Sequence, residues 1–544
     1  MIRGLIFFKI VSFFISACSE KPKTTVDLIL YNAKIYTVNE DFEMAQAIAI
    51  QADTIVAIGS NKDILNHYQS AKTIDLDQKT VFPGLIDAHS HFYGYGKNLQ
   101  ELNLKGVGSL EEMINLVVSY ASKTAPTYII GRGWDENNWH TQGSINKSKL
   151  DVMFPTVPVF LQRVDGHSAL CNQVALDMAG IGPNTYVNGG EVEVFGDIMT
   201  GIVKDKAMDL VKQKLPIPDR SFQNQILMDA QKSCFSYGLT TVCDAGLPTE
   251  TIELMDSMAN ANQLKIRLYA MFDPDTAKII TFWEKHPNLN KRLKAHSIKL
   301  YGDGSVGSST ACLKHPYADN KSNYGFIIEN EDFYRSILRF CYNRNLQANT
   351  HCIGDSANKY LLGLYADILE DKNDNRWRIE HAQLVDNADI DMFGRFSIIP
   401  SVQPTHATSD FHMFNKNVGL MNPSYNAGYN YKSLLMQNNY IAFGTYFPVE
   451  GVNPLNTFFS ATKRKTSDGE IFNIEQAVTT LEALKAMTIW AAKANFMENE
   501  VGSLEVGKKA DLCVFSDDFM YAQNADKILC LMTICGGEVV FDVR

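Results

Sequence analysis

The sequence has few of the features that mark a fibrous, disordered or disulfide-built protein. Only 17 of its 544 residues are proline and 45% are apolar, which argues against long disordered, collagen-like or coiled-coil stretches. Its 10 cysteines are spread along the chain without a CxxC pair, so we expect neither a disulfide framework nor a structural zinc module. The length predicts three or four domain-sized units, or one large barrel with additions.

Positive charge is also scarce. The chain has 50 lysines and arginines against 61 aspartates and glutamates, a formal net charge of −11. A surface that binds a polyanion needs an excess of positive charge, so we expect no nucleic-acid partner.

The one long apolar run lies at the N-terminus. Residues 5–17 (LIFFKIVSFFISA) follow Arg3 and precede Cys18, and the run is too short to span a bilayer. Residues 15–18 resemble a bacterial lipobox, in which Cys18 becomes the lipidated first residue. We therefore predict a signal peptide (1–17), a tether (18–25) and an exported lipoprotein anchored in the membrane and facing the periplasm. The alternative is a cytoplasmic protein with an apolar tail.

The residue patterns at both ends of the folded part indicate β structure. Residues 26–38 and 47–59 are β-branched runs broken at Asn32-Ala33 and at Ala52-Asp53, which predicts two hairpins. Residues 510–515 and 531–541 repeat this character, with Gly536-Gly537 as the turn. We expect residues 26–82 and 500–544 to build one composite β domain.

Between these ends, eight short apolar runs alternate with helix-length segments. Such runs are typical of parallel strands covered by helices, and eight of them predict a closed (β/α)₈ barrel over residues 83–499. The gap after the first run is far longer than a normal connection, so an insertion is expected within about residues 99–230. The runs are 85–88, 239–242, 266–271, 298–301, 346–350, 378–380, 398–402 and 441–444.

Four histidines stand at the ends of these runs. His89 and His91 form an HxH pair, whose side chains share one face of a strand. His351 and His381 occupy equivalent positions after two later strands. Active sites lie at the carboxyl ends of barrel strands, and neutral imidazole is a common ligand of zinc-like ions, so the four predict a metal site.

Lys299 lies within the expected strand HSIKLYGDG, where an unpaired ammonium would be costly to bury. Two readings stay open: a salt bridge to Asp303 or another acid, or carboxylation of the amine by CO₂ to give an anionic ligand that bridges two metals. Residues 302–307 also fit GxGxxG, but Pro316 follows within nine residues of Gly307, and no helix and second strand complete the unit. We therefore expect no nucleotide cofactor.

At this point the sequence resembles the amidohydrolase superfamily, and within it the YtcJ-like branch that includes N-substituted formamide deformylases. The resemblance runs in order from about Val26 to the C-terminus. It rests on PGLIDAHSHF, GRGWDENNW, RVDGHS, GLTTVCDAG, IKLYGDGSVGS, THCIGD, RIEHAQ, SVQPTHATSD, PVEGVNPL and GSLEVGKKADLCVF.

The resemblance implies a metal-bearing (β/α)₈ barrel with a composite β-sandwich domain made from both chain ends. His89 and His91 would hold one divalent metal, with zinc expected, and His351 and His381 a second. A carboxylated Lys299 would bridge them; whether one or two metals bind is left open. The residues placed near the substrate are Trp134, Asp135, His167 and Asp303. Trp134 and Asp135 have an alternative role as core and cap of the insertion.

One position departs from the family pattern. The last barrel strand usually carries an aspartate that ligands a metal and moves a proton, but here the motif reads GTYFPVE with Tyr446 in its place. A phenol with its usual pKa near 10 is a poor base at neutral pH, although an adjacent metal could lower that pKa. His406 or Asp410 could carry the proton instead, or only bind substrate and cap a helix. Cys243, where the branch often has histidine, is expected to pack.

The leading hypothesis is a metal-dependent hydrolase of C–N bonds in a small amide-like or N-formyl-like molecule. The rival is a ligand-binding barrel that keeps its metal histidines but has lost turnover at Tyr446. A nicotinamide-dependent oxidoreductase is a third, less favoured class, because it would need cofactor binding at residues 302–307. Substrate identity is beyond the sequence, and a homodimer is left open.

Overall fold

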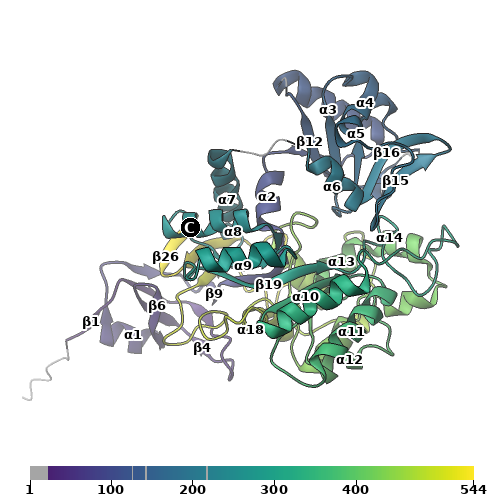
Figure 1. The fold of residues 1–544 in the computed structure, drawn as a ribbon. Helices are drawn as coiled ribbons and strands as arrows, with labels where there is room; N and C mark the ends of the chain where they lie inside the picture. Colours follow the sequence, from purple (N-terminus) through teal and green to yellow (C-terminus); the bar gives the residue numbers. More distant parts are fainter. Residues whose placement is uncertain (1–21, 125, 141–143, 216–218) are drawn as a thin grey trace, which may run out of the picture.

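The computed structural model describes residues 22–124, 126–140, 144–215 and 219–544. A central barrel carries a β region on one side and an α/β insertion above it (Figure 1). The expected signal peptide and Cys18 lie outside the described residues, so export and lipidation stay predictions. Within the described ranges, no helix combines the length and hydropathy that a membrane crossing requires.

The central sheet has eight strands, all parallel and each paired with the next along the chain. They coincide with the eight predicted runs and are buried on both faces, so the predicted (β/α)₈ fold class is confirmed. The strands are β10 (Leu85–Ser90), β17 (Leu239–Leu247), β18 (Arg267–Phe272), β19 (Leu293–Tyr301), β20 (Gln347–Cys352), β21 (Arg378–His381), β22 (Ile399–Val402) and β23 (Ala442–Phe443).

The barrel closes through backbone hydrogen bonds just beyond β23. The N–H of Tyr446 donates to the carbonyl of His89 at 3.0 Å, and the N–H of His91 donates to that of Phe447 at 2.9 Å. Gly444 permits this approach, because a Cβ there would lie 2.5 Å from the backbone nitrogen of His89. Closure therefore places residue 446 beside the HxH pair.

Helices cover the outside of the sheet (Figure 1). In α10 the buried residues Tyr334, Ile337, Leu338 and Cys341 form one stripe, and Asn330 caps the first turn. The helices of this region are α2 (Phe92–Asn98), α7 (Arg220–Phe235), α8 (Thr249–Asn260), α9 (Thr276–Lys285), α10 (Glu331–Asn343), α11 (Asp355–Leu369), α12 (Asp391–Arg395), α13 (Pro404–Ser409), α14 (Phe411–Phe414), α15 (Tyr431–Asn438), α16 (Pro454–Lys463), α17 (Thr480–Ala486) and α18 (Ile489–Ala494). Single turns lie at η2 (Asn415–Gly419), η3 (Pro423–Ala427) and η4 (Ile474–Gln476).

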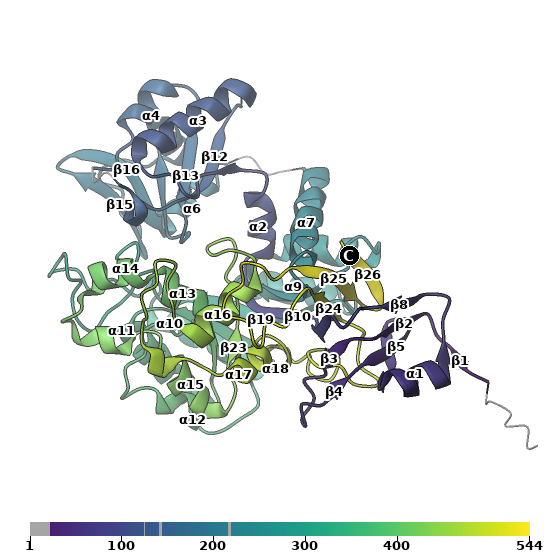
Figure 2. The ribbon, with the colours of Figure 1, turned by 180° about the vertical axis from the view of Figure 1, so that it is seen from behind.

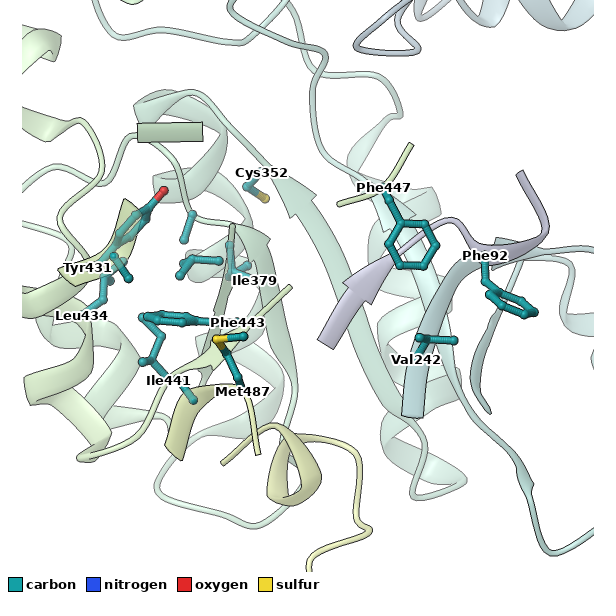
Figure 3. Packing of buried hydrophobic residues seen from close by; sticks show 14 of the residues in the cluster. Phe92, Val242, Cys352, Ile379, Tyr431, Leu434, Ile441, Phe443, Phe447 and Met487 are labelled. Carbon is teal, nitrogen blue, oxygen red and sulfur yellow. The ribbon is translucent and has the colours of Figure 1, made fainter. Parts of the chain in front are cut away.

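The largest apolar core fills the space between this sheet and its helices. Figure 3 shows part of it, with Leu434 near Ile441 and Phe443 on one side and Phe92 near Val242 on the other. Full burial of a leucine or phenylalanine side chain stabilises a fold by about 1.5–3 kcal/mol. The barrel wall is therefore held mainly by apolar packing, which leaves its interior free to carry polar groups.

The β region combines both chain ends in one sheet, with β9 paired to β24. The six-stranded sheet has the order β26-β25-β24-β9-β3-β4, a four-stranded sheet has the order β6-β5-β2-β8, and β1 pairs with β7. The elements are β1 (Thr24–Thr25), β2 (Leu28–Tyr31), β3 (Lys34–Tyr36), β4 (Met44–Ala45), β5 (Ala47–Gln51), β6 (Thr54–Gly59), α1 (Asn61–His67), β7 (Tyr68–Gln69), β8 (Thr73–Asp75), β9 (Thr80–Pro83), β24 (Leu512–Phe515), β25 (Cys530–Cys535) and β26 (Glu538–Asp542).

Of the predicted hairpins, β5–β6 and β25–β26 form as expected. The prediction of a hairpin at residues 26–38 is wrong. Strand β2 pairs with β5 and β8, whereas β3 pairs with β4 and β9. The break at Asn32, whose φ is 57°, sends the chain from one sheet to the other instead of back along itself. Strand β1 also lies within the expected tether, so regular secondary structure is present before Val26.

The insertion follows α2 and returns to the barrel through α7; Figure 2 shows it from behind, standing above the barrel. Its sheet has the order β11-β12-β13-β14-β16-β15, with two apolar cores of its own. The elements are β11 (Leu102–Asn103), α3 (Leu110–Thr124), β12 (Ile129–Trp134), η1 (Glu136–Asn138), α4 (Ser148–Met153), β13 (Val159–Arg163), β14 (Ser168–Cys171), α5 (Gln173–Ala179), β15 (Gly190–Phe195), β16 (Ile198–Asp205) and α6 (Lys206–Lys212).

A buried ion pair joins the barrel to the β region. Arg267, at the start of β18, donates to Asp511, just before β24, at 2.6 and 3.1 Å. We predict that Arg267→Met lowers the free energy of unfolding by about 3–5 kcal/mol, because it leaves the Asp511 carboxylate buried without its partner. The double variant Arg267→Met/Asp511→Leu should lose less than the single variant. Urea unfolding checks both, and an equal loss in the two would contradict the prediction.

Candidate active site

Five predicted side chains converge at the carboxyl ends of the barrel strands. His89 lies in β10, Lys299 in β19, His351 in β20 and His381 at the end of β21, while His91 directly follows β10. The ring centroids of His89 and His381 are 4.7 Å apart, and those of His351 and His381 are 4.5 Å apart. We call these five residues the imidazole cluster; their role as metal ligands stays a prediction.

His89 is held by a buried chain of charges. Its Nδ1 lies 2.5 Å from Oε2 of Glu380, and Glu380 accepts hydrogen bonds from Arg378 at 2.6 and 3.0 Å. All three side chains are shielded from solvent. Because an ionised carboxylate only accepts hydrogen bonds, Nδ1 of His89 carries the proton and Nε2 keeps its lone pair.

His381 is oriented in the same way by Gln403. Oε1 of Gln403 lies 2.6 Å from Nδ1 of His381, and Nε2 of Gln403 donates to the carbonyl of Ser401, which orients the amide. The other ring nitrogen, Nε2, is buried without a hydrogen-bond partner, and so is Nδ1 of His351. Buried polar atoms of this kind are costly and call for a water or an ion.

Lys299 lies inside the cluster, with Nζ 3.4 Å from Nε2 of His89. Burial lowers the pKa of Lys299 to about 8, although the charge of Glu380 acts in the opposite direction. No ion pair of Lys299 is found among the described residues, so the salt bridge to Asp303 does not form. Asp303 is buried, and its oxygens accept the backbone N–H groups of Cys312, Ile353 and Gly354. Carboxylation of the amine stays open.

The donor types of the cluster fit a divalent cation. Burial and the neighbouring positive charges lower the pKa of His89, His351 and His381 well below the usual value, so these rings are neutral, the form that binds metals. Over the described ranges, no three or more His, Cys, Asp or Glu side chains are grouped closely enough to hold an ion. The fit therefore rests on the kind of donor and on the two partnerless ring nitrogens.

Tyr446 packs its ring against four imidazoles. Its ring centroid lies 5.2 Å from that of His89, 5.4 Å from His91, 4.7 Å from His381 and 5.2 Å from His406. Burial raises the pKa of Tyr446 far above its usual value. Without a bound cation the phenol is therefore neutral at physiological pH and a poor general base.

A cavity of about 480 Å³ lies between the insertion and the barrel. Tyr446, His406 and His167 are part of its wall, whereas the five residues of the imidazole cluster are not. Tyr446 therefore contacts both the cavity and the rings of the cluster. A pocket of this size, with a few polar groups directed into it, is typical of a small-molecule site.

Residues 72–541 match the amidohydrolase family. The chain belongs to this family. Three relatives match nearly its whole length. Protein LONG AFTER FAR-RED 3 of Arabidopsis thaliana is 30% identical over 95% of this chain and 91% of its own. YtcJ of Bacillus subtilis is 28% identical over 94% and 99%. N-substituted formamide deformylase of Arthrobacter pascens is 23% identical over 90% and 94%. The resemblance to the YtcJ-like branch is thus confirmed.

Solved structures support the amidohydrolase fold. An uncharacterized metal-dependent hydrolase from Pyrococcus horikoshii has a TM-score of 0.75 at 23% identity and covers 91% of this chain and 98% of its own. An adenosine deaminase from Xanthomonas campestris, solved with bound zinc, has a TM-score of 0.55 at 12% identity, with coverage of 96% and 94%. At these identities the likeness concerns the fold alone.

The insertion of this amidohydrolase places its predicted residues in different surroundings. Trp134 packs in the insertion core and donates to the carbonyl of Leu161 at 2.7 Å, as the alternative role described it. Asp135 caps η1 and also lines the cavity. Nδ1 of His167, in the cavity wall, lies 2.6 Å from Asp205. Burial lowers the pKa of His167, but the hydrogen bond and charge of Asp205 outweigh burial and raise it overall.

The two proposed proton carriers, His406 and Asp410, line the cavity beside Tyr446. Asp410 makes no capping hydrogen bond to α14; it accepts hydrogen bonds from Gln383 and Tyr429, each at 3.1 Å. Burial raises the pKa of Asp410 to about 6, which is close to the range where a carboxylate works as a base at neutral pH.

Sequence reasoning missed Arg378, Glu380 and Gln403, which hold the histidines in place. Strand alternation puts neighbours on opposite faces, so strand geometry alone would not place Glu380 and His381 in one site. The φ of His381 is 72°, which breaks the alternation and lets both side chains enter the barrel. The available signal was the acid beside the histidine in RIEH, because metal-binding histidines often pair with a carboxylate.

Two other sequence features have structural roles. Residues 302–330, all of them described, contain no helix, so the GxGxxG motif lacks the helix N-terminus that a dinucleotide site requires. Cys243 is buried beside Tyr269, and its thiol donates to Asn495 at 3.2 Å. Packing is therefore what the structure shows for this cysteine.

If the cluster binds a divalent metal, we predict that Gln403→Leu weakens that binding by about 10–100-fold, because His381 loses the acceptor that orients its ring. Gln403→Glu is the matched control, since it keeps an acceptor at the same place and should retain most of the affinity. Competition against a chelator of known affinity measures both. Equal affinities for native protein and Gln403→Leu would contradict this prediction.

Proposed function

We propose that this amidohydrolase is a metal-dependent hydrolase that cleaves a C–N bond, of amide or N-formyl type, in a small molecule. The observation that carries the proposal is the convergence of four imidazoles and Lys299 at one end of the barrel, beside a cavity of about 480 Å³. The deformylase relative, by its name, acts on an N-substituted formamide. This chemistry supports a carbonyl–nitrogen bond as the target.

Zinc is the cation that we propose, because an imidazole-rich set of donors suits it and an adenosine deaminase of the same fold was solved with zinc. When bound, such a cation polarises a carbonyl and lowers the pKa of water. The residues that would hold it are His89, His91, Lys299, His351 and His381.

The chain itself supplies orientation and proton transfer. Glu380 and Gln403 hold Nδ1 of His89 and His381, so each ring keeps a lone pair on Nε2. Asp410 and His406 stand in the cavity wall where a substrate amide would lie. We assign proton transfer to Asp410, because its raised pKa suits a base and its hydrogen bonds fix its carboxylate. His406 then contacts substrate.

The rival function, a ligand-binding barrel without turnover, is favoured by one observation. Tyr446 stands where the family motif has an aspartate, and its phenol ring lies against His381 and lines the cavity. Proton transfer by a positioned group is worth roughly 10²–10⁴ in rate, so loss of the aspartate would remove most of the activity.

We predict that native protein loaded with zinc hydrolyses at least one member of a panel of N-formyl and N-acyl amines. Tyr446→Asp should raise kcat/KM by roughly 10²-fold or more, because it restores a carboxylate for proton transfer. Release of the free amine measures both. The matched control is Tyr521→Asp, which makes the same change at a side chain that is 78% exposed.

Activity that appears only in Tyr446→Asp supports the rival function for the native chain. Equal rates in native protein and Tyr446→Asp would show that the aspartate is dispensable here. If neither protein hydrolyses any amide while zinc is bound, the proposed reaction is wrong.

A second prediction concerns pH. Asp410 acts as a base only when ionised, and burial raises its pKa to about 6. Activity is therefore present above this pH and lost as the pH falls through it. We expect an acid limb of kcat/KM with its midpoint near that value, and Asp410→Asn should remove the limb. His406→Gln should keep the limb and move its midpoint to higher pH, because the charge of His406 lowers the pKa of Asp410. An acid limb that survives in Asp410→Asn would exclude this role.

A further inference from the structure

Four arginine side chains are buried in the described part of the chain, and one of them lacks a counterion there. Arg163, Arg267 and Arg378 each form an ion pair with a carboxylate, at 2.8, 2.6 and 2.6 Å. The fourth, Arg464, is fully buried, yet no carboxylate of the described residues forms an ion pair with it. Because an unpaired charge is costly to bury, Arg464 needs another source of compensation.

The guanidinium of Arg464 is fixed in place, but most of its donors are unused. Arg464 ends α16 with a φ of 52°, and Nε donates to the carbonyl of Phe472 at 2.9 Å. Nη1 and Nη2 are both buried without a hydrogen-bond partner among the described residues. Each of these nitrogens carries two hydrogens, so four N–H donors stay free.

Aromatic rings enclose the guanidinium without neutralising it. Its central carbon lies 5.2 Å from the ring centroid of Tyr431 and 5.5 Å from that of Phe472. Such cation–π contacts offset only part of the cost of burying a charge. Burial lowers the pKa of Arg464, but a guanidinium stays protonated in proteins. The charge therefore has to be compensated by something other than the two rings.

Neither the nearby acid nor water supplies that compensation. The charge of Glu475 acts on Arg464, but the side chain of Glu475 is exposed to solvent and forms no ion pair with it. Water molecules would satisfy the four N–H groups and leave the positive charge unpaired. An anion would do both, as the carboxylates do at the other three buried arginines.

We propose that the free N–H groups of Arg464 bind a small monovalent anion of the chloride type. Full burial of Arg464 limits the ion to a compact, singly charged one, because a larger charge would cost more to remove from water. Arg464 belongs neither to the imidazole cluster nor to the wall of the cavity. The inference therefore goes beyond the proposed function and does not depend on it.

Tyr431 connects this anion site to the imidazole cluster. Its ring contacts Arg464, and its hydroxyl donates to the carbonyl of Gln403 at 3.2 Å. The side chain of Gln403 lies 2.6 Å from Nδ1 of His381. The anion would thus stabilise the layer that supports His381, which is a structural role and not a catalytic one.

Anomalous diffraction from crystals of the native protein grown in sodium bromide tests the proposal, because bromide replaces chloride and scatters anomalously. We expect one bromide peak within hydrogen-bonding distance of Nη1 or Nη2 of Arg464. Water density alone at these nitrogens, at saturating bromide, would overturn the inference. This test needs no variant, so it decides the question even if a substitution at Arg464 prevents folding.

Thermal unfolding in sodium chloride and in sodium gluconate, at equal ionic strength, gives a second measurement. An ion bound only by the folded state stabilises it, so chloride should raise the melting temperature of native protein by about 2 °C. Arg464→Met should abolish this increase, and Arg464→Lys, which keeps the charge, should retain it. An equal increase in native protein and Arg464→Met would overturn the inference, and so would its absence in native protein.

Arg376→Met is the matched control for this measurement. Arg376 also lies over a phenylalanine ring, that of Phe496, but it has carboxylate partners in Asp374 and Glu498. Its substitution should leave the chloride-dependent increase unchanged. Loss of the increase in Arg376→Met as well as in Arg464→Met would show a general effect of removing an arginine, and it would count against a site at Arg464.

Discussion

The buried chain from Arg378 through Glu380 to His89 is the interaction on which the centre of this amidohydrolase depends. Its side chains are shielded from solvent, and Arg378 also donates to the carbonyl of Ala88 and the hydroxyl of Ser401. The chain therefore links three barrel strands through charged hydrogen bonds. Removing a buried charge from its partner is strongly unfavourable, so this network specifies how the strands are placed around the site.

This polar interior has a chemical consequence. Burial keeps the imidazoles neutral, the form that donates a lone pair to a metal. The same burial keeps the phenol of Tyr446 protonated. The buried environment therefore favours metal binding by the imidazoles and disfavours proton transfer by Tyr446. The departure at residue 446 is therefore more than a substitution in a motif, because it changes the charge available to the whole cluster.

The insertion contributes the other half of the cavity. Arg163 reaches the cavity wall from β13 and pairs with Asp165 at 2.9 Å and Glu136 at 2.8 Å. Nearby, His167 is held by Asp205. A barrel of this fold serves many reactions, and selectivity is set by the loops and insertions around it. We therefore expect the side chains of this wall to select the substrate in the proposed reaction.

The sequence alone determined the barrel, since runs that are apolar on both faces and separated by helices have few other solutions. It also located His89, His351 and His381, because a histidine at the end of such a run must lie at the active end of a barrel. The tertiary structure alone decided what surrounds them. His381 shares the site with Glu380 because its φ is positive, and β2 and β3 part into two sheets. Tyr446 meets four imidazoles because the barrel closes beside β10, and contacts between segments so distant along the chain leave no local pattern to read.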